Sequence, residues 1–119
     1  MNKIYYIDPT PAPRQSRRDK WDPSEAVQRY RAFKDLVKIH AVDVKPSRQH
    51  IIFHVAMPKS WSKKKRHIFN GQPHTHKPDV DNLLKALLDA IFGDDAHIWD
   101  IRASKLWAEQ GMIVIEEIE

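Results

Sequence analysis

The sequence contains no cysteine, which excludes disulfide bonds, thiolate metal sites and thiol catalysis. A bound metal would therefore have to use oxygen or imidazole ligands. The sequence also has no apolar segment close to the ~20 residues of a membrane span, and its first residues, MNKIYYIDPTPAPR, lack the apolar run of a signal peptide. From these absences we expect a soluble, cytoplasmic protein that is not attached to a membrane.

No internal repeat and no long structureless tract divides the 119 residues, so residues 1–119 are predicted to form a single domain with one modest core. Lysine and arginine together number 20, aspartate and glutamate 16, and the formal net charge is +4. A basic balance of this kind favours a polyanionic partner.

Apolar periodicity predicts two helices. The first follows Asp22, which is expected to cap it with Pro23 in the first helical position. Its apolar face consists of Ala26, Tyr30, Phe33, Val37 and Ala41. The second helix is predicted over residues 82–92, where leucine and isoleucine recur at helical spacing before Gly93.

Four segments have the composition of strands, namely residues 3–7, 50–58, 98–107 and 112–119. The last two are expected to pair as a hairpin. Together with the two helices, these strands predict an α+β domain in which two main helices pack on a small mixed or antiparallel sheet.

Two basic segments lie outside the main elements. The first, PTPAPRQSRRDKW, is predicted to be an extended, solvent-facing arm because proline alternates with other residues there. The second, PKSWSKKKRHIFNGQPHTHKP, has no sustained apolar period and is expected to form a mobile loop or a short basic helix. Each segment is either a solvated charge run or a surface for a polyanion.

The stretch KPDVDNLLKALLDAIFGDD gathers acidic residues in a basic protein. Asp81 is expected just before the second helix, where its carboxylate either caps the helix or takes part in a site. Asp79 comes two residues earlier, so an extended backbone would place both carboxylates on one side. Two anions that close repel each other unless a cation or a proton joins them. Mg²⁺ is the natural candidate because it prefers oxygen ligands, keeps several waters and often binds substrate phosphate.

Lys85 follows Asp81 by four residues and therefore lies on the same helix face. It forms either a surface ion pair or, beside a metal site, a contact to phosphate. Asp94 and Asp95 are either an ordinary turn or the source of a third carboxylate. Because the predicted helix rises ~15 Å along its length, Asp95 needs a shorter helix, a folded-back turn or a partner subunit to reach Asp81. Asp100 is a second candidate for the third carboxylate.

The histidines allow a competing interpretation, in which His67, His74 and His76 form the metal site of a different hydrolase. The tripeptide HTH is short and flanked by proline, and it lacks a convincing third ligand. A polar loop is therefore the favoured interpretation of these residues.

The segment KPDVDNLLKALLDAIFGDDAHIWD resembles the central signature of the RusA family of Holliday junction resolvases. In that family an Asp-x-Asp-Asn motif, a lysine one turn later and an Asp-Asp pair after the helix occur in this order. The segments PTPAPRQSRR and MPKSWSKKKR are similar, more loosely, to phage and prophage members. The resemblance therefore covers most of the chain.

The resemblance implies a homodimeric α+β endonuclease that binds four-way DNA junctions and uses Mg²⁺ to make paired nicks, in DNA recombination and repair. By position in the motif, Asp79, Asp81 and Asp95 would bind metal and act in catalysis, and Lys85 would be the helix lysine of the site. Water would attack phosphorus in line, and the 3′ oxygen would leave.

The basic segments would then contact DNA phosphates, which gives affinity without sequence information. The residues expected to do so are Arg14, Arg17, Arg18, Lys63, Lys64, Lys65 and Arg66. Trp61 or Phe69 would either stack on bases at the branch point or pack internally. The alternative function is that of a DNA-binding accessory protein without catalysis, in which the acids only cap helices.

Overall fold

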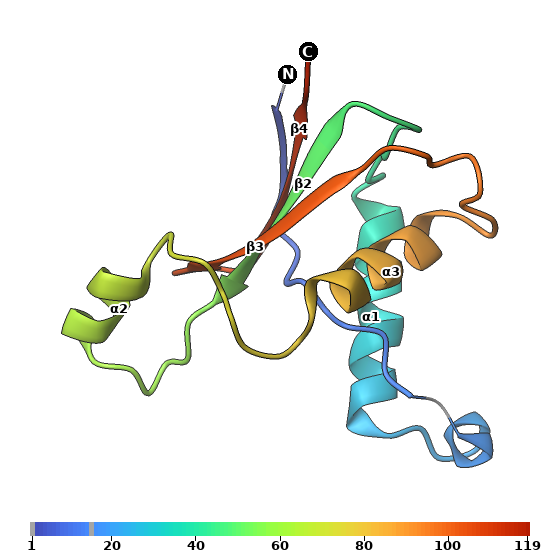
Figure 1. The fold of residues 1–119 in the computed structure, drawn as a ribbon. Coiled ribbons are helices and arrows are strands. Elements are labelled where there is room, and N and C mark those ends of the chain that lie inside the picture. The colour runs from blue at the N-terminus through green and yellow to red at the C-terminus, as the bar shows by residue number, and fades with distance from the viewer. Residues whose placement is uncertain (1, 15) are drawn as a thin grey trace.

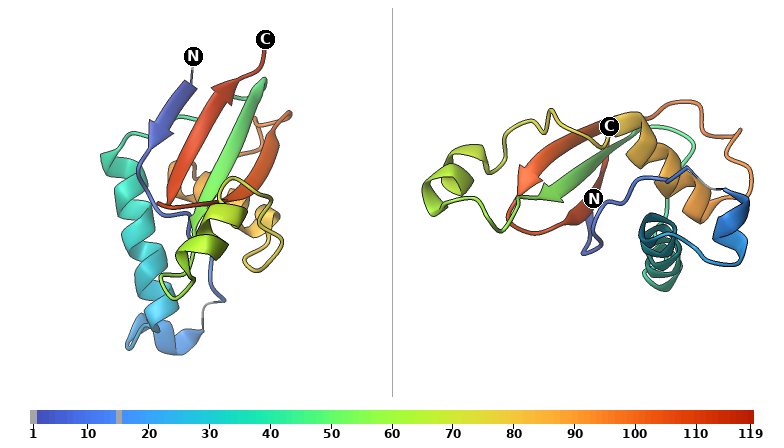
Figure 2. Two further views of the ribbon diagram at one scale, coloured as in Figure 1. Left: turned by 90° about the vertical axis from the view of Figure 1, so that its left-hand side faces the viewer. Right: turned by 90° about the horizontal axis from the view of Figure 1, so that it is seen from below.

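A computed structural model describes residues 2–14 and 16–119, and within these residues four strands form one mixed sheet (Figure 1). The strands are β1 (Asn2–Tyr5), β2 (Gln49–Ala56), β3 (Arg102–Ala108) and β4 (Met112–Glu117). Their spatial order is β1-β4-β2-β3, with β4 antiparallel to both neighbours and β3 parallel to β2. Figure 2 shows β1 and β3 at the two edges.

The helical elements are unequal in length and role. They are the 3₁₀ helix η1 (Arg17–Lys20) and the α-helices α1 (Glu25–Ile39), α2 (Lys63–Phe69) and α3 (Val80–Ile91). The long helices α1 and α3 lie together on one side of the sheet, whereas α2 projects on the other side (Figures 1 and 2). In the described part of the chain, no helix has the length and apolar character needed to cross a membrane.

The core fills the space between the sheet and the two long helices. Its most deeply buried members include Val27, Phe33 and Val37 of α1, Leu83, Ala86 and Leu87 of α3, and Ile51, Phe53 and Ile113 of the sheet. The strong apolar period of α3 thus has a direct cause, because one face of this helix is fully covered. The predicted α+β class, with a mixed sheet and two main helices, is confirmed.

The predicted hairpin of the last two strands is wrong. β4 does not pair with β3, because β2 lies between them and pairs with both. The chain passes from β2 through α2 and α3 before it enters β3, which is the long crossover that a parallel pair requires. This crossover carries α3 across the sheet and fixes where the acidic segment lies.

The start of α1 also differs from the prediction. Ser24, not Asp22, is the N-cap residue, and its hydroxyl accepts a hydrogen bond from the Val27 N–H at 3.2 Å. Asp22 instead pairs with Arg18 at 3.1 Å. The buried carboxylate of Asp19 accepts from the backbone N–H of Ser24 at 2.9 Å, which fixes the entry into the helix.

The basic arm, residues 9–14 and 16–21, is only partly extended. Residues 17–20 form η1, and Asp19 closes this turn by accepting from the Ser16 N–H at 2.7 Å. The hydrogen bonds that Asp19 accepts from the backbone N–H groups of Ser24 and Ser16 lower the pKa of its carboxyl group. The arm is therefore stapled to the start of α1 rather than free in solvent.

Candidate active site

Helix α3 begins at Val80, two residues earlier than predicted. Asp79 is the N-cap residue, and its carbonyl accepts the first helical hydrogen bond from the Leu83 N–H at 3.1 Å. Asp79 has the expected extended backbone, but Asp81 lies inside the first turn, so the prediction that Asp81 stands just before the helix is wrong. The reason is packing, because Val80 and Leu83 already contact the core and extend the helix toward Asp79.

Both carboxylates are exposed at the positive end of the α3 dipole. The Asp79 side chain makes no capping bond and instead lies 3.0 Å from the Lys77 ammonium. Because that pair is largely exposed, it contributes little to stability and can be exchanged for another cation. The first turn of α3 therefore presents two exposed carboxylates that the fold does not need for its own stability.

Lys85 lies in a groove of about 490 Å³ that follows α3 from Lys85 toward the C-terminal end of the helix. The groove is lined by Ala12, Pro13, Tyr30, Lys34, Lys85, Asp89, Phe92 and Gly93. Asn82 donates from its side chain to the Ala12 carbonyl at 3.4 Å, which ties the arm to α3. Burial and the nearby Asp89 raise the pKa of Tyr30. Lys85 and the arm thus border the same open surface.

The third predicted acid lies at the opposite end of α3. Twelve helical residues separate Asp79 from Phe92, a rise of roughly 18 Å. In the turn that follows, Asp94 accepts from the Ala96 N–H at 2.9 Å, and Asp95 is exposed. Among residues 2–14 and 16–119, no three acidic or histidine side chains come close enough to hold a metal ion.

The pair at the start of α3 nevertheless suits Mg²⁺. This ion commonly binds through one or two carboxylates and completes its shell with waters and substrate phosphate. Asp79 and Asp81 supply two exposed oxygen ligands on a helical turn that is open to solvent. Asp95 and its rival Asp100 are both exposed, but neither joins Asp79 and Asp81 in a three-acid cluster within one chain.

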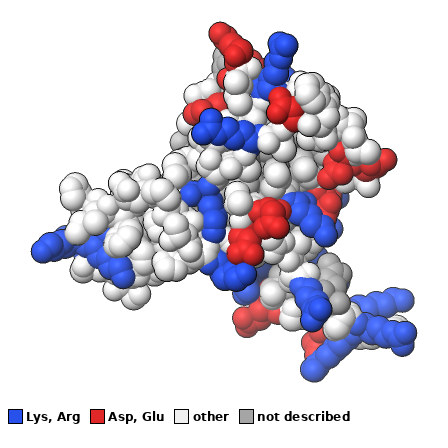
Figure 3. Space-filling view, viewed as in Figure 1, with Lys and Arg blue, Asp and Glu red and all other residues white. Residues whose placement is uncertain are grey.

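Basic side chains gather on both sides of the acids. Figure 3 shows acidic side chains near the middle of one face, with lysine and arginine concentrated over η1 at the lower right and over α2 at the left. Arg14, Arg17 and Arg18 are exposed on the arm, and Lys63 and Lys64 are exposed on α2. A polyanion that contacted both regions would pass across the start of α3.

Two of the predicted basic contacts on α2 are already engaged within the protein, as is Arg18 of the arm, which pairs with Asp22. Arg66 donates to Glu109, with the shorter bond at 2.6 Å, and to the Pro58 carbonyl at 3.1 Å. Lys65 places its ammonium 4.1 Å from the centre of the Trp61 ring. Arg66 therefore anchors α2 to the end of β3, which leaves Lys63 and Lys64 as its most available cations.

An aromatic cluster joins α2 to the sheet. The Trp107 ring on β3 lies 4.8 Å from Trp61 and 4.2 Å from His74, and Trp61 lies 5.4 Å from Phe69. Trp61 thus packs against Phe69 and Trp107, which agrees with the alternative of internal packing. The histidine metal site is wrong, because no three-ligand group forms in the described residues and His74 is buried against Trp107.

His74 makes the stability of this cluster dependent on pH. Its pKa is lowered from 6.5, first by burial and then by the positive charge of Lys105, and the buried Nδ1 has no hydrogen-bond partner in the described structure. The unfolded chain therefore takes up a proton more readily than the folded one, so stability is present above about pH 6.5 and declines below it. Burial also lowers the pKa of His50 and His54 in the same direction.

We expect the melting temperature of the protein to fall between about pH 7.5 and about pH 5.5, and His74→Leu to remove part of that fall. Leucine keeps bulk next to Trp107 but cannot be protonated. His67→Gln, at an exposed position of α2, is the control. An unchanged pH slope in His74→Leu would contradict the assignment.

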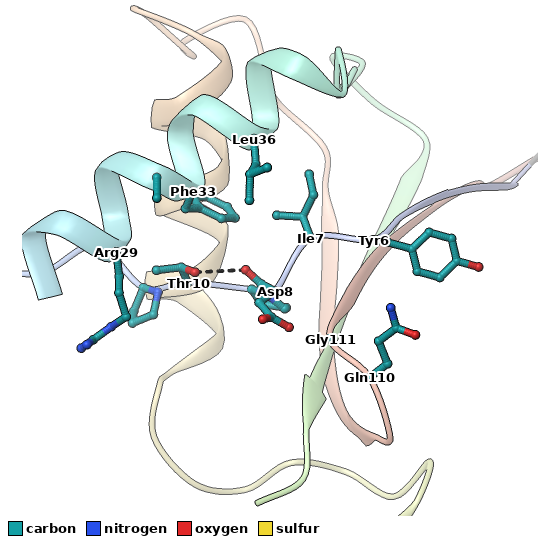
Figure 4. Close-up of a pocket in the computed structure, with 12 residues that line it drawn as sticks. Tyr6, Ile7, Asp8, Thr10, Arg29, Phe33, Leu36, Gln110 and Gly111 are labelled. Atoms are coloured by element: carbon teal, nitrogen blue, oxygen red, sulfur yellow. Dashed lines mark hydrogen bonds between the residues drawn. The ribbon is translucent and has the colours of Figure 1, made fainter. Parts of the chain in front are cut away.

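A groove larger than the one beside Lys85 lies away from the acidic residues of α3. It measures about 590 Å³ and runs between α1 and the segment after β1 (Figure 4). Asp8 approaches Gly111 there so closely that a side chain at Gly111 would overlap its carboxylate. None of the acidic residues of α3 lines this groove, so it is a separate feature.

Sequence reasoning missed Lys105 of β3. Its ammonium donates to the carbonyls of His76 and Pro78, directly before Asp79. The alternating pattern of a strand signals which face a residue occupies but not which loop it holds. The one sign that Lys105 has a structural partner is its position on a half-buried strand face, where a lysine is uncommon.

Comparison with known proteins supplies the family. The family profile described as Endodeoxyribonuclease RusA matches residues 6–118. A relative, the uncharacterized protein YqaN of Bacillus subtilis strain 168, is 40% identical over 68 residues, which cover 50% of this chain and 47% of the relative. The chain thus spans about half the length of the curated relative that it matches.

Proposed function

The chain belongs to the RusA family of endodeoxyribonucleases, and from this premise we propose that it cuts four-way DNA junctions in a Mg²⁺-dependent reaction. The observation that carries the proposal is the exposed pair Asp79 and Asp81 at the start of α3. Figure 3 shows acidic side chains on one face between the basic regions over η1 and α2. Such a protein would act on cellular DNA in the cytoplasm, during recombination and repair.

Each side chain at the start of α3 would have a distinct role in the reaction. Asp79 and Asp81 would hold Mg²⁺, which when bound supplies charge neutralisation at the phosphate and favours ionisation of water. Lys85 would contact the phosphate and stabilise the negative charge that develops on it during displacement. Lys77 pairs with Asp79 at 3.0 Å and would be displaced when a cation binds there.

The basic regions would supply affinity. Arg14, Arg17 and Arg18 on the stapled arm and Lys63 and Lys64 on α2 would contact DNA phosphates, so binding should weaken as salt rises. Lys65 and Arg66 would contribute less, since they are engaged with Trp61 and Glu109.

The test is to incubate the purified protein with a synthetic four-way junction and with a linear duplex of matched sequence, in Mg²⁺ or in EDTA. The proposal predicts nicking of the junction in Mg²⁺, little nicking of the duplex and none in EDTA. Junction binding without nicking in any divalent ion would instead support the accessory-protein function.

A homodimer would bring Asp95 of one subunit to the site of the other. Because Asp95 lies beyond the far end of α3, we propose that it serves the Asp79 and Asp81 pair of the second subunit, and that the dimer offers two sites to a two-fold symmetric junction.

Mixed dimers of Asp79→Asn and Asp95→Asn subunits test this arrangement. If Asp95 acts across the dimer, one site of each mixed dimer keeps both acids, so single nicks reappear although each variant alone is inactive. If Asp95 acts within its own subunit, both sites are defective and mixing restores nothing. The nicking rate before and after subunit exchange distinguishes the two outcomes.

A further inference from the structure

We propose that Lys105 is a positioning residue that sets the orientation of the Asp79 carboxylate from the sheet. This inference rests on the proposed function for its consequence in catalysis, but the contact itself is a feature of the fold. Lys105 lies in the middle of β3, an edge strand, and its side chain is half-buried.

The approach segment, residues 71–78, runs along the outer edge of β3. The Gly71 N–H donates to the Trp107 carbonyl at 2.8 Å, and the Trp107 N–H donates to the Gln72 carbonyl at 2.9 Å. One step further, the His74 N–H donates to the Lys105 carbonyl at 3.1 Å. The backbone of β3 thus holds the segment as far as His74.

Beyond His74 the side chain of Lys105 continues this attachment. Its ammonium donates to the Pro78 carbonyl at 2.7 Å and also to the His76 carbonyl. Two of its three N–H donors are therefore used on the last residues before α3. Bonds from a charged donor at a half-buried site are stronger than neutral ones on the surface.

The contact to Pro78 matters because of peptide geometry. The Pro78 carbonyl and the Asp79 nitrogen belong to one planar peptide unit, so fixing the carbonyl fixes the plane from which Asp79 departs. The Asp79 side chain makes no capping bond, so its carboxylate is not held by the backbone of α3. Lys105 therefore fixes the backbone from which the Asp79 side chain departs. The exposed Lys77 ammonium contacts the Asp79 carboxylate.

The direct test is amide hydrogen exchange in Lys105→Met, which keeps the apolar stem and removes the ammonium. The Leu83 amide reports on the N-cap because it bonds to the Asp79 carbonyl. We expect it to exchange about tenfold faster than in the wild type, as loss of a charge-assisted bond allows. The control is Lys38→Met, at an exposed position on the last turn of α1.

The second readout is the Mg²⁺ concentration that gives half-maximal nicking of a four-way junction, measured below the melting temperature of every variant. Lys105→Met should raise it by about tenfold, while Lys38→Met should leave it unchanged. A role in stability alone would lower the melting temperature without moving the Mg²⁺ requirement of the folded enzyme. Should Lys105→Met not fold, Lys105→Gln, which is too short to reach both carbonyls, is measured in the same way.

The outcomes separate the two proposals. Unchanged Leu83 exchange, or an unchanged Mg²⁺ requirement in an active enzyme, would overturn the role of Lys105. Faster Leu83 exchange in a protein whose wild type nicks no DNA would leave the contact intact and overturn the proposed function.

Discussion

Asparagine in place of Asp79 or Asp81 is expected to reduce junction nicking by about a hundredfold or more and to leave junction binding nearly unchanged. An amide has the size of a carboxylate but no negative charge, so it binds Mg²⁺ weakly and does not offset the charge of the cation. The fold should tolerate both changes, because both side chains are exposed and the Asp79 side chain makes no capping bond.

The measurements are the single-turnover nicking rate in Mg²⁺ and the affinity for the junction in EDTA. Asp35→Asn is the matched control, because Asp35 is an exposed aspartate on α1 that is not placed at the site. A near-normal nicking rate in both α3 variants would contradict the catalytic role of Asp79 and Asp81.

The second large effect is expected at Trp107, where alanine should lower the free energy of unfolding by about 3–5 kcal/mol. This side chain is 6% exposed and packs against Trp61, His74 and His76. Its loss would leave a cavity at the junction of α2, the approach segment and β3. We therefore expect α2 to lose its support together with the segment that leads to Asp79.

Urea unfolding of Trp107→Ala and of Trp99→Ala makes the comparison. Trp99 has the same chemistry but is 76% exposed, so its replacement should cost less than about 0.5 kcal/mol. Proteolysis within residues 58–78 gives an independent readout, and it should be faster in Trp107→Ala alone. Equal effects of the two substitutions would contradict the proposed role of the cluster.

The elements of the fold were predictable from the sequence because their patterns are local. Tyr30, Phe33 and Val37 recur at helical spacing and are buried, as the pattern requires. The pairing of β3 was not predictable from such patterns, because its partner is chosen across the whole sheet. The segment between β2 and β3 is long enough for a crossover, and the nearness of β3 and β4 in sequence misled the prediction.

The candidate site was predictable in composition but not in arrangement. The spacing of Asp79, Asp81 and Lys85 identified the acidic segment, yet the boundary of α3 depends on how Val80 packs, which sequence does not reveal. The role of Lys105 depends on a contact between residues 27 positions apart. Arg66 looked like a free cation in a basic run, and its bond to Glu109 required the fold to bring the two together.

The most direct measurement of junction cutting by the start of α3 is a map of nick positions. A four-way junction is labelled at the 5′ end of one strand at a time and incubated with the wild-type protein in Mg²⁺. Paired nicks at symmetric positions in two strands of like polarity, absent in Asp79→Asn, are the predicted result. Nicks in one strand only, nicks that persist in Asp79→Asn, or no nicks in any strand would contradict it.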